Sequence, residues 1–473
     1  MPIKRALALL VAACTVIVGI CGCKSTKQSG SVSSDVFLSD IESLSPIVVD
    51  DNPKTDNEKS QSPSNDSSTK GTAGSESVPQ SPIPQTAQET VAETPEPTVI
   101  NEDIPEQEIT EVEPKTVITK QSSPLAYDAL SAKQKIIYAT VLSMAEQMTE
   151  GFVELGEYYN TAQNDISVAY RAVLYDCPEI FWLPTQFFIS VRETSFSKKV
   201  LIAFKYSNGE YNCDYLVKKS ERAKCVAELN AVVNKVKAEV EKQKLDSYQS
   251  ELYIHDYICG VTTYSSESGD LQYTSYGALV LKKAVCEGYA RAFALLLRSI
   301  EIPCVLVNGE SQDQGHMWNM VCLDDNWYYV DVTWDDQSLV LHSYFNATYD
   351  MIKSDHALNK KLSDYDIAEL DYSINFNYFY YKTESRNFNY FEHESLIITE
   401  DMERLAVGIV AQSKKGVNVA QCTFENGTVL NHYKLTPSTF HTKLNKLLKS
   451  SGIVVVSASS IGNYILFSWQ TIG

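Results

Sequence analysis

Apolar side chains recur every three or four residues in three stretches of the N-terminal half, which is the spacing of a helix that buries one face. The first predicted helix covers residues 132–148, and the second covers residues 165–174 and ends before Pro178. The third covers residues 218–244 and carries many charged side chains. These three stretches predict a folded segment that contains several helices.

Shorter apolar runs predict strands around and beyond these helices. In the N-terminal half they are residues 181–183 and 200–204, and Ser207-Asn208-Gly209 is predicted to be a turn. Toward the C-terminus, four further runs predict strands: 417–424, 428–433, 453–456 and 464–469. Asn426-Gly427 favours a hairpin between the first two of these runs, and a helix is predicted over residues 436–449.

The region between these halves combines a helical stretch with a predicted hairpin. Residues 286–297 have helical spacing and several small side chains, which predicts a helix that packs closely against a sheet. Residues 316–323 and 327–334 alternate between apolar and polar, and the polar residues 324–326 separate them. Together with the flanking segments, this order predicts an α+β fold.

The register of this hairpin decides which side chains meet. A loop with an even number of residues puts Cys322 opposite Trp327, and His316 opposite Thr333. Asp331 is then the diagonal neighbour of His316 on the same face, roughly 7–8 Å away. A loop with an odd number of residues would put His316 and Asp331 on opposite faces of the sheet.

Charge and cysteine content limit the kind of partner and the kind of site. The chain has 473 residues, of which 60 are acidic and 40 basic, and its net charge of −20 argues against nucleic acid as a partner. The cysteines include no Cys-x-x-Cys pair and no other cluster of metal ligands is visible, so neither a metal nor a cofactor is predicted. The sequence does not decide whether Cys213 and Cys225 form a disulfide. Cys304 and Cys322 are predicted to be buried thiols.

The N-terminus has the pattern of a bacterial export signal. Lys4 and Arg5 precede the apolar run 6–20, which is too short to span a membrane comfortably. The run ends in Cys21-Gly22-Cys23 before a polar stretch, which resembles a lipobox. This resemblance implies a lipid on Cys23 that anchors the protein to the extracytoplasmic face of the cell membrane. An ordinary secretory signal is the alternative.

These patterns divide the chain into five segments. Residues 1–22 are the predicted lipoprotein signal peptide, and residues 23–124 are a predicted disordered, acidic tether rich in Ser, Thr and Pro. An N-terminal α+β segment follows over 125–250. A domain that contains the predicted helix 286–297 and the predicted hairpin covers 251–372, and a β-rich α+β segment covers 373–473.

Cys286, His316 and Asp331 have the residue types of a thiol-based catalytic site. The dipole at a helix N-terminus favours the thiolate form of a cysteine. A histidine is the usual base for a thiol, and a carboxylate fixes the tautomer of the ring and stabilises its cation. Each residue alone is more commonly a core cysteine, a structural histidine or a turn carboxylate, so the hypothesis depends on their combination.

The residues around these three positions resemble the transglutaminase-like superfamily. The resemblance lies in Cys286-Glu287-Gly288-Tyr289-Ala290, in His316-Met317-Trp318-Asn319 and in residues 327–334, which occur in the order and at spacings similar to those of the family. His255-Asp256-Tyr257 resembles the opening helix of the family, and Asp355-His356 resembles its closing segment.

The resemblance implies a papain-like core in which the cysteine helix packs on an antiparallel sheet that carries His316 and Asp331. It implies attack of the Cys286 thiolate on an amide carbonyl of a protein or a peptidoglycan-linked peptide, with a thioester intermediate. The backbone N–H of Cys286 would be one oxyanion donor. Tyr276 is a candidate for the second donor, with core packing as its alternative.

Two interpretations of function remain open. In the first, the chain is a peptidase, an amidase or a transglutaminase, three chemistries that share the thioester. In the second, it is a non-catalytic surface module that keeps the fold for binding, because a fold does not determine a function. Trp318 and Trp334 are expected either to shield the site or to belong to the core, and His255 and His356 are expected to be structural.

Overall fold

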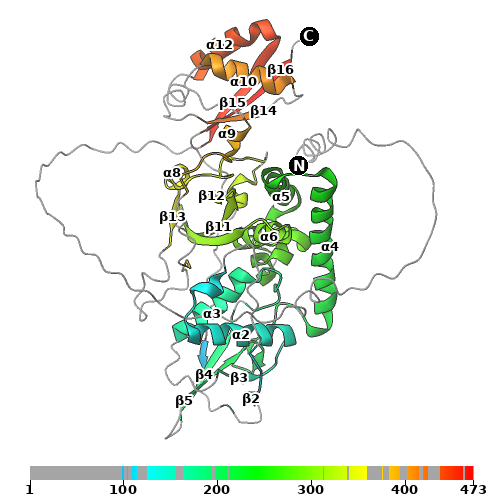
Figure 1. The fold of residues 1–473 in the computed structure, drawn as a ribbon, viewed down its shortest axis with the longest axis vertical. Coiled ribbons are helices and arrows are strands. Elements are labelled where there is room, and N and C mark those ends of the chain that lie inside the picture. The colour runs from blue at the N-terminus through cyan, green and yellow to red at the C-terminus, as the bar shows by residue number, and fades with distance from the viewer. Residues whose placement is uncertain are drawn as a thin grey trace, which may run out of the picture. The chain divides into compact units, whose positions relative to one another are not determined.

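The computed structural model describes a folded body that begins near residue 98 (Figure 1). The described residues are 98–100, 104, 109–114, 125–155, 163–184, 186–193, 198–210, 212–267, 269–312, 314–337, 340–359, 375–376, 383–394, 402–414, 419–423, 437–461 and 464–471. The predicted signal peptide, Cys23 and most of the predicted tether therefore lie outside them. Within these residues, no helix has the length and apolar character needed to cross a membrane.

The N-terminal segment is built on a five-stranded sheet with the order β1-β4-β5-β3-β2. Its strands are β1 (Thr98–Ile100), β2 (Ile109–Thr110), β3 (Phe152–Glu154), β4 (Phe188–Glu193) and β5 (Lys198–Ala203). Helices α2 (Ala132–Gln147) and α3 (Gln163–Asp176) pack against each other, and the short η3 (Ala126–Ala129) precedes them. The hairpin of β6 (Tyr206–Ser207) and β7 (Asn212–Cys213) confirms the predicted turn.

Two predictions for this segment are wrong. The composition predicts a tether up to residue 124, yet β1 and β2 pair with the sheet, and Ile100 and Ile104 are buried with Phe152. The prediction rests on the average composition of the stretch, which is polar, and two isolated isoleucines near its end change that average little. Residues 181–183 form a turn and not a strand, because the apolar run reflects burial: the indole of Trp182 donates a hydrogen bond to the carbonyl of Ala145.

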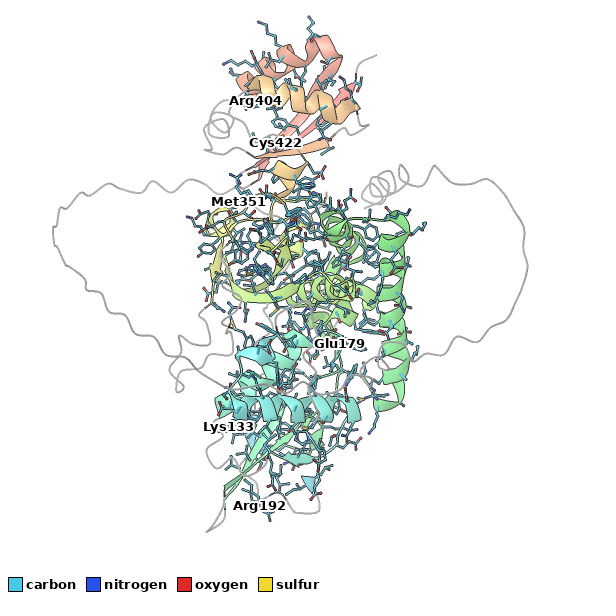
Figure 2. All side chains as sticks on the ribbon, in the orientation of Figure 1. Lys133, Glu179, Arg192, Met351, Arg404 and Cys422 are labelled. Atoms are coloured by element: carbon cyan, nitrogen blue, oxygen red, sulfur yellow. The ribbon has the colours of Figure 1, made fainter. Side chains whose placement is uncertain are left out.

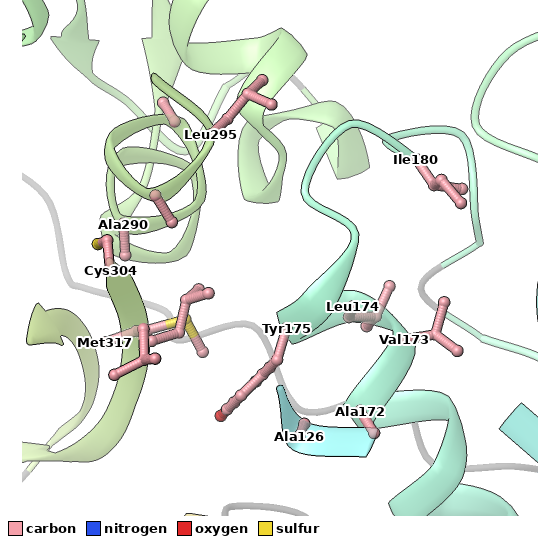
Figure 3. Packing of buried hydrophobic residues seen from close by; sticks show 14 of the residues in the cluster. Ala126, Ala172, Val173, Leu174, Tyr175, Ile180, Ala290, Leu295, Cys304 and Met317 are labelled. Atoms are coloured by element: carbon pink, nitrogen blue, oxygen red, sulfur yellow. The ribbon is translucent and has the colours of Figure 1, made fainter. Parts of the chain in front are cut away.

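Two helices connect this segment to the centre of the molecule. They are α4 (Lys219–Gln243), which confirms the predicted long helix, and α5 (Ser247–Val261). The predicted domain boundary at residue 251 falls inside α5, and one hydrophobic core extends across it. Figure 3 shows this core, where Leu174 and Tyr175 of α3 belong to the same cluster as Ala290 and Met317. The two predicted segments are thus parts of one packed body.

The central segment places one helix against a four-stranded antiparallel sheet with the order β12-β11-β10-β13. The strands are β10 (Cys304–Ser311), β11 (Gln314–Leu323), β12 (Asn326–Val330) and β13 (His356–Leu358). Helix α6 (Cys286–Ser299) packs on β10 and β11, and the amide of Asn319 donates to the carbonyl of Ala290 at 3.0 Å. This arrangement confirms the expected cysteine helix on an antiparallel sheet. Between α5 and α6 lie β8 (Thr263–Tyr264), η4 (Gly269–Tyr273), η5 (Gly277–Leu281) and β9 (Lys283–Ala284).

The β11–β12 hairpin has the even loop that the pattern allows. The loop consists of Asp324 and Asp325, whose φ angles of 45° and 61° are those of a type I′ turn. Cys322 pairs with Trp327, which confirms the predicted register.

The second strand of this hairpin is shorter than its alternating pattern predicts. β12 ends at Val330, and the short helix α7 (Val332–Asp335) follows. Thr333 therefore does not lie opposite His316, and that part of the prediction is wrong. The strand ends because the Asp331 side chain accepts the N–H groups of Thr333 and Trp334 and so caps α7.

The C-terminal segment is a three-stranded antiparallel sheet with the order β14-β16-β15 and two helices. Its elements are α10 (Met402–Lys414), β14 (Val419–Thr423), α12 (Pro437–Leu448), η8 (Lys449–Ser451), β15 (Ile453–Ile461) and β16 (Tyr464–Thr471), after the short α8 (Tyr349–Ile352) and α9 (Tyr390–His393). The predicted helix and three of the predicted strands are confirmed, whereas Asn426-Gly427 and residues 428–433 lie outside the described residues. This segment has its own hydrophobic cluster, which contains Cys422 (Figure 2).

Candidate active site

Cys286 is the first residue of α6, at the positive end of the helix dipole. Gly288 lets this end of the helix approach η4 closely, because a Cβ at that position would lie 2.4 Å from the carbonyl oxygen of Gln272. The Cys286 side chain is 6% exposed. Its thiol is free, as are the other seven described cysteines, so Cys213 and Cys225 do not pair. Cys304 is fully buried as predicted, and Cys322 is half-buried.

His316 lies on β11 and is bonded to Asp331 through one ring nitrogen. Its Nε2 is 2.6 Å from Oδ2 of Asp331, and both residues are buried. Its other nitrogen, Nδ1, is buried without a hydrogen-bond partner of ordinary geometry. Burial opposes protonation of the ring, but the charge of Asp331, the hydrogen bond to it and the neighbouring Cys286 sulfur raise the pKa of His316 well above its ordinary value. The three predicted residues therefore come together.

Asp331 holds its position through four hydrogen bonds. Oδ1 accepts the backbone N–H groups of Thr333 at 2.9 Å and of Trp334 at 3.1 Å, which are the capping bonds of α7. Oδ2 faces the Nε2 atoms of His316 and His356. Burial would raise the pKa of Asp331, but the charge of His316 and these hydrogen bonds hold it well below its usual range. The carboxylate is therefore a fixed anion behind the His316 ring.

His356 belongs to this cluster, although the sequence predicts only a structural histidine there. It is the first residue of β13, which pairs with β10 beside the strand that carries His316. Its Nε2 is 2.9 Å from Oδ2 of Asp331, and its Nδ1 is 2.7 Å from Oδ1 of Asp355. The adjacent pair Asp355-His356 was the available signal, but nothing local predicts that it reaches Asp331.

Two tryptophans enclose the His316 ring. The ring centroids of Trp318 and Trp334 lie 5.7 Å and 6.2 Å from that of His316, and Trp318 is almost fully buried. Trp318 fits over β10 because residue 309 is a glycine: a Cβ there would lie 2.3 Å from its indole ring. Trp318 belongs to the hydrophobic core and also lies beside the ring, whereas Trp334 is only partly buried and contacts the ring from outside that core.

Tyr276 is not positioned as an oxyanion donor. Its hydroxyl donates to Oε2 of Glu228 at 2.7 Å, and its ring stacks on Phe181 with a centroid distance of 4.5 Å. The alternative, core packing, is the one that the structure supports. His255 is a buried structural histidine as expected, with its two ring nitrogens 2.9 Å from Asp256 and 3.3 Å from Asp335.

Two groups of histidine and aspartate side chains bring possible metal-ligand atoms within 4.8 Å of one another in the described part of the chain. They are His316, Asp331 and His356, and His255, Asp256 and His342. In each group one carboxylate oxygen is bonded to two imidazole rings, at 2.6 Å and 2.9 Å in the first and at 2.9 Å and 2.8 Å in the second. Hydrogen bonds account for both geometries.

Comparison with known proteins finds a family model that matches part of the chain. Residues 234–332 match the model of the transglutaminase-like superfamily, a stretch that contains Cys286, His316 and Asp331. No curated protein matches the chain.

Three solved structures are similar to part of the chain. One is described as a TGase, with 14% identity and a TM-score of 0.22, over 32% of this chain and 51% of that chain. A candidate cysteine protease from Cytophaga hutchinsonii has 13% identity and a TM-score of 0.20, over 31% and 61%. A candidate protease from Parabacteroides distasonis has 12% identity and a TM-score of 0.18, over 30% and 39%. The chain thus spans less than two thirds of each of them, and scores this low add nothing to the geometry above.

Proposed function

Since the chain carries a transglutaminase-like domain at residues 234–332, we propose that it is a thiol enzyme that attacks amide or peptide carbonyl groups. The observation that supports this most is the buried His316–Asp331 pair, with an Nε2 to Oδ2 distance of 2.6 Å, beside the free thiol of Cys286. A thiol, an imidazole and a fixed carboxylate in this order are the parts that activation of a thiol nucleophile requires.

The chemistry then follows from the charges of the site. The proton of the Cys286 thiol moves to Nδ1 of His316, and the thiolate adds to the carbonyl carbon of the substrate. As the tetrahedral intermediate collapses, the C–N bond breaks, the leaving amine takes the proton from His316, and a thioester remains on Cys286. Water or an acceptor amine then adds to the thioester carbonyl while His316 removes its proton. The C–S bond breaks, and His316 returns the proton to the sulfur, which restores the thiol. Asp331 stays an anion throughout.

One oxyanion donor is provided by the helix that carries the nucleophile. Cys286 is the first residue of α6, where a backbone N–H has no acceptor within the helix. We infer that this N–H would stabilise the negative charge that develops on the carbonyl oxygen of the substrate. Hydrolysis and transfer to an amine use the same intermediate and differ only in the acceptor.

The proposal extends to the location of the protein. We infer that Cys23 is lipidated after removal of residues 1–22 and that the acidic segment after it tethers the enzyme to the extracytoplasmic face of the membrane. The substrates would then be proteins or peptidoglycan-linked peptides. Cys23→Ala should release the protein into the medium, as fractionation with an antibody would detect, and retention in the membrane would contradict the anchor.

The test of the chemistry is the selectivity of thiol alkylation. With iodoacetamide near pH 6, a thiolate paired with an imidazolium reacts while ordinary thiols stay protonated. Peptide mapping should find Cys286 modified before every other cysteine, and His316→Ala should remove that preference. Equal labelling of all accessible thiols would support the alternative, a binding module without catalysis. Intact-mass analysis with a peptide-amide pool then distinguishes thioester capture, hydrolysis and amine transfer.

A further inference from the structure

The carboxylate of Asp331 is shared between two histidines, and the second one has no free nitrogen. His356 contacts Oδ2 of Asp331 through Nε2 at 2.9 Å and Oδ1 of Asp355 through Nδ1 at 2.7 Å. The hydroxyl of Tyr344 donates to the other oxygen of Asp355 at 3.0 Å, which fixes that carboxylate. His316, on the other hand, uses only one of its nitrogens for Asp331.

Two hydrogen bonds to carboxylates determine the charge of His356. A carboxylate that is an anion can only accept, so each of the two ring nitrogens has to carry a proton. A ring with two N–H groups is an imidazolium. Burial opposes this charge, but the bonds to Asp331 and Asp355 and the charge of Asp331 raise the pKa of His356, while His316 lowers it.

The surroundings of His356 contain no other charged group among the contacts described for it. Besides Asp331, Asp355 and His316, its ring meets the aromatic rings of three residues at centroid distances of 4.9, 4.9 and 5.0 Å: Trp318, Trp334 and Tyr344. The ring is 1% exposed. Its charge is therefore weakly screened, and its centroid lies 5.6 Å from that of His316.

We propose that His356 is a positioning residue for the thiol chemistry: it keeps a positive charge behind Asp331 and thereby sets the pH range in which the Cys286–His316 pair is reactive. This rests on the proposed function. Because His356 shares the carboxylate, Asp331 stabilises the His316 cation less than it would alone. The positive charge of His356, whose ring centroid lies 5.6 Å from that of His316, also opposes protonation of His316. The His316 titration therefore occurs at lower pH than it would without His356.

The variant that separates charge from hydrogen bonding is His356→Gln. The amide of glutamine can donate to Asp331, but it carries no charge. Two charges at about 6 Å interact strongly enough, at an effective dielectric constant of about 20, to shift a titration by about two pH units. His356→Gln should therefore move the His316 titration up by about two units. His356→Ala should show the same shift and a lower maximum, because Asp331 also loses a hydrogen bond.

The readout is the rate of Cys286 alkylation by iodoacetate as a function of pH. This anionic probe reacts fastest while Cys286 is a thiolate and His316 is protonated, so the profile is a bell whose two limbs report the two titrations. In His356→Gln the limb that reports the His316 titration should move up by about two units. His342→Gln is the matched control, since His342 bonds to Asp256 at 2.8 Å and not to Asp331, and its limbs should coincide with those of the wild type.

Limbs of His356→Gln that coincide with the wild type, or a uniform loss of rate without a shift, would overturn the proposal. A second measurement needs no variant: nitrogen NMR of the labelled wild-type protein should find His356 with two N–H groups at pH 7, and a single neutral tautomer would also overturn it. Failure of the proposed function is distinguishable, because it appears in the wild type as a Cys286 that is no more reactive than other thiols and insensitive to His316→Ala.

Discussion

The central segment contains two carboxylates that are each bonded to two imidazole rings, and only one of them serves a candidate site. The Asp331 network consists of His316, Asp331 and His356, and the Asp256 network consists of His255, Asp256 and His342. In both, a single carboxylate oxygen is bonded to both rings. The residue types and the pattern of bonds alone therefore do not identify the catalytic site.

The two networks differ in what their histidines face. His316 leaves Nδ1 without a carboxylate, on the side of the Cys286 sulfur. His255 has carboxylates at both nitrogens, Asp256 at 2.9 Å and Asp335 at 3.3 Å, so no nitrogen is left to accept a proton from a thiol.

A cysteine lies beside the Asp256 network as well. Cys259 is buried on α5, and its thiol donates to the carbonyl of Val332 at 3.7 Å. Burial, followed by the negative charges of Asp336, Asp335 and Asp256, raises the pKa of the Cys259 thiol well above its usual value. A sulfur that faces carboxylates stays a thiol, whereas a sulfur that faces an imidazole with a free nitrogen can become a thiolate. This difference distinguishes the Asp256 network, which is structural, from the candidate active site around Asp331.

The largest effect should appear when the thiols of Cys286 and Cys259 are each removed in turn. Cys286→Ala removes the nucleophile, so release of ammonia or amine from a peptide-amide pool should fall by about 10⁴-fold or more. Cys259→Ala removes a buried thiol of the other network and should change that rate by less than about threefold. Comparable losses in both variants would mean that the Asp256 network takes part in the chemistry.

The next effect concerns the two carboxylates. Asp331→Asn removes the charge that raises the pKa of His316, so alkylation of Cys286 near pH 6 should slow by about 10³-fold. The matched variant is Asp256→Asn, whose side chain is 46% exposed. Asp256→Asn should leave the alkylation rate within about twofold, because the described hydrogen bonds of Asp256 join it to His255 and His342 and not to His316. A loss of alkylation in Asp256→Asn would mean that the Asp256 network also contributes to the reactivity of Cys286.

The Asp256 network should instead be visible in the pH dependence of stability. Burial lowers the pKa of His255, but the hydrogen bonds and charges of Asp256 and Asp335 outweigh it and raise the pKa from 6.5 to about 9. Because the pKa of His255 is higher in the folded state, its protonation stabilises the fold fully at pH values below 6.5. This contribution to the free energy of unfolding is lost as pH rises from 6.5 through 9. Wild type should therefore exceed His255→Gln by about 2–3 kcal/mol in urea unfolding near pH 6, and by little near pH 10. A difference that does not change with pH would show that His255 is neutral.

The sequence predicts those features that are encoded locally. Helical spacing gives α2, α4 and α12 to within one or two residues of their ends. Alternation and an even loop bring His316 and Asp331 to the same face. The resemblance of the motifs points to three residues that the structure brings together, because the helix and the strands that carry them are consecutive.

The features that it misses depend on contacts between distant segments or on competition between two local signals. His356 reaches Asp331 only because the three-residue β13 pairs with β10, and so short a strand has no pattern of its own. Residues 331–334 alternate like a strand, yet the capping bonds of Asp331 turn them into the start of α7. The same capping bonds fix the Asp331 carboxylate, which is bonded to His316 and His356. The wrongly predicted end of the strand and the missed contact of His356 therefore both involve this carboxylate.

The smallest effect should come from a methyl group next to each network. At Gly309, a Cβ would lie 2.2 Å from the carbonyl oxygen of Ala357 and 2.3 Å from Trp318, which stacks on His316. Gly309→Ala should therefore cost about 1–3 kcal/mol in urea unfolding, and a displaced Trp318 should lower the alkylation rate of Cys286 as well. Gly260, on the helix that carries His255, has nothing within 4 Å of such a Cβ. Gly260→Ala should leave alkylation unchanged and stabilise the protein by up to about 1 kcal/mol through helix propensity. If both variants left alkylation unchanged, the tight packing of Trp318 would have no part in holding the His316 ring.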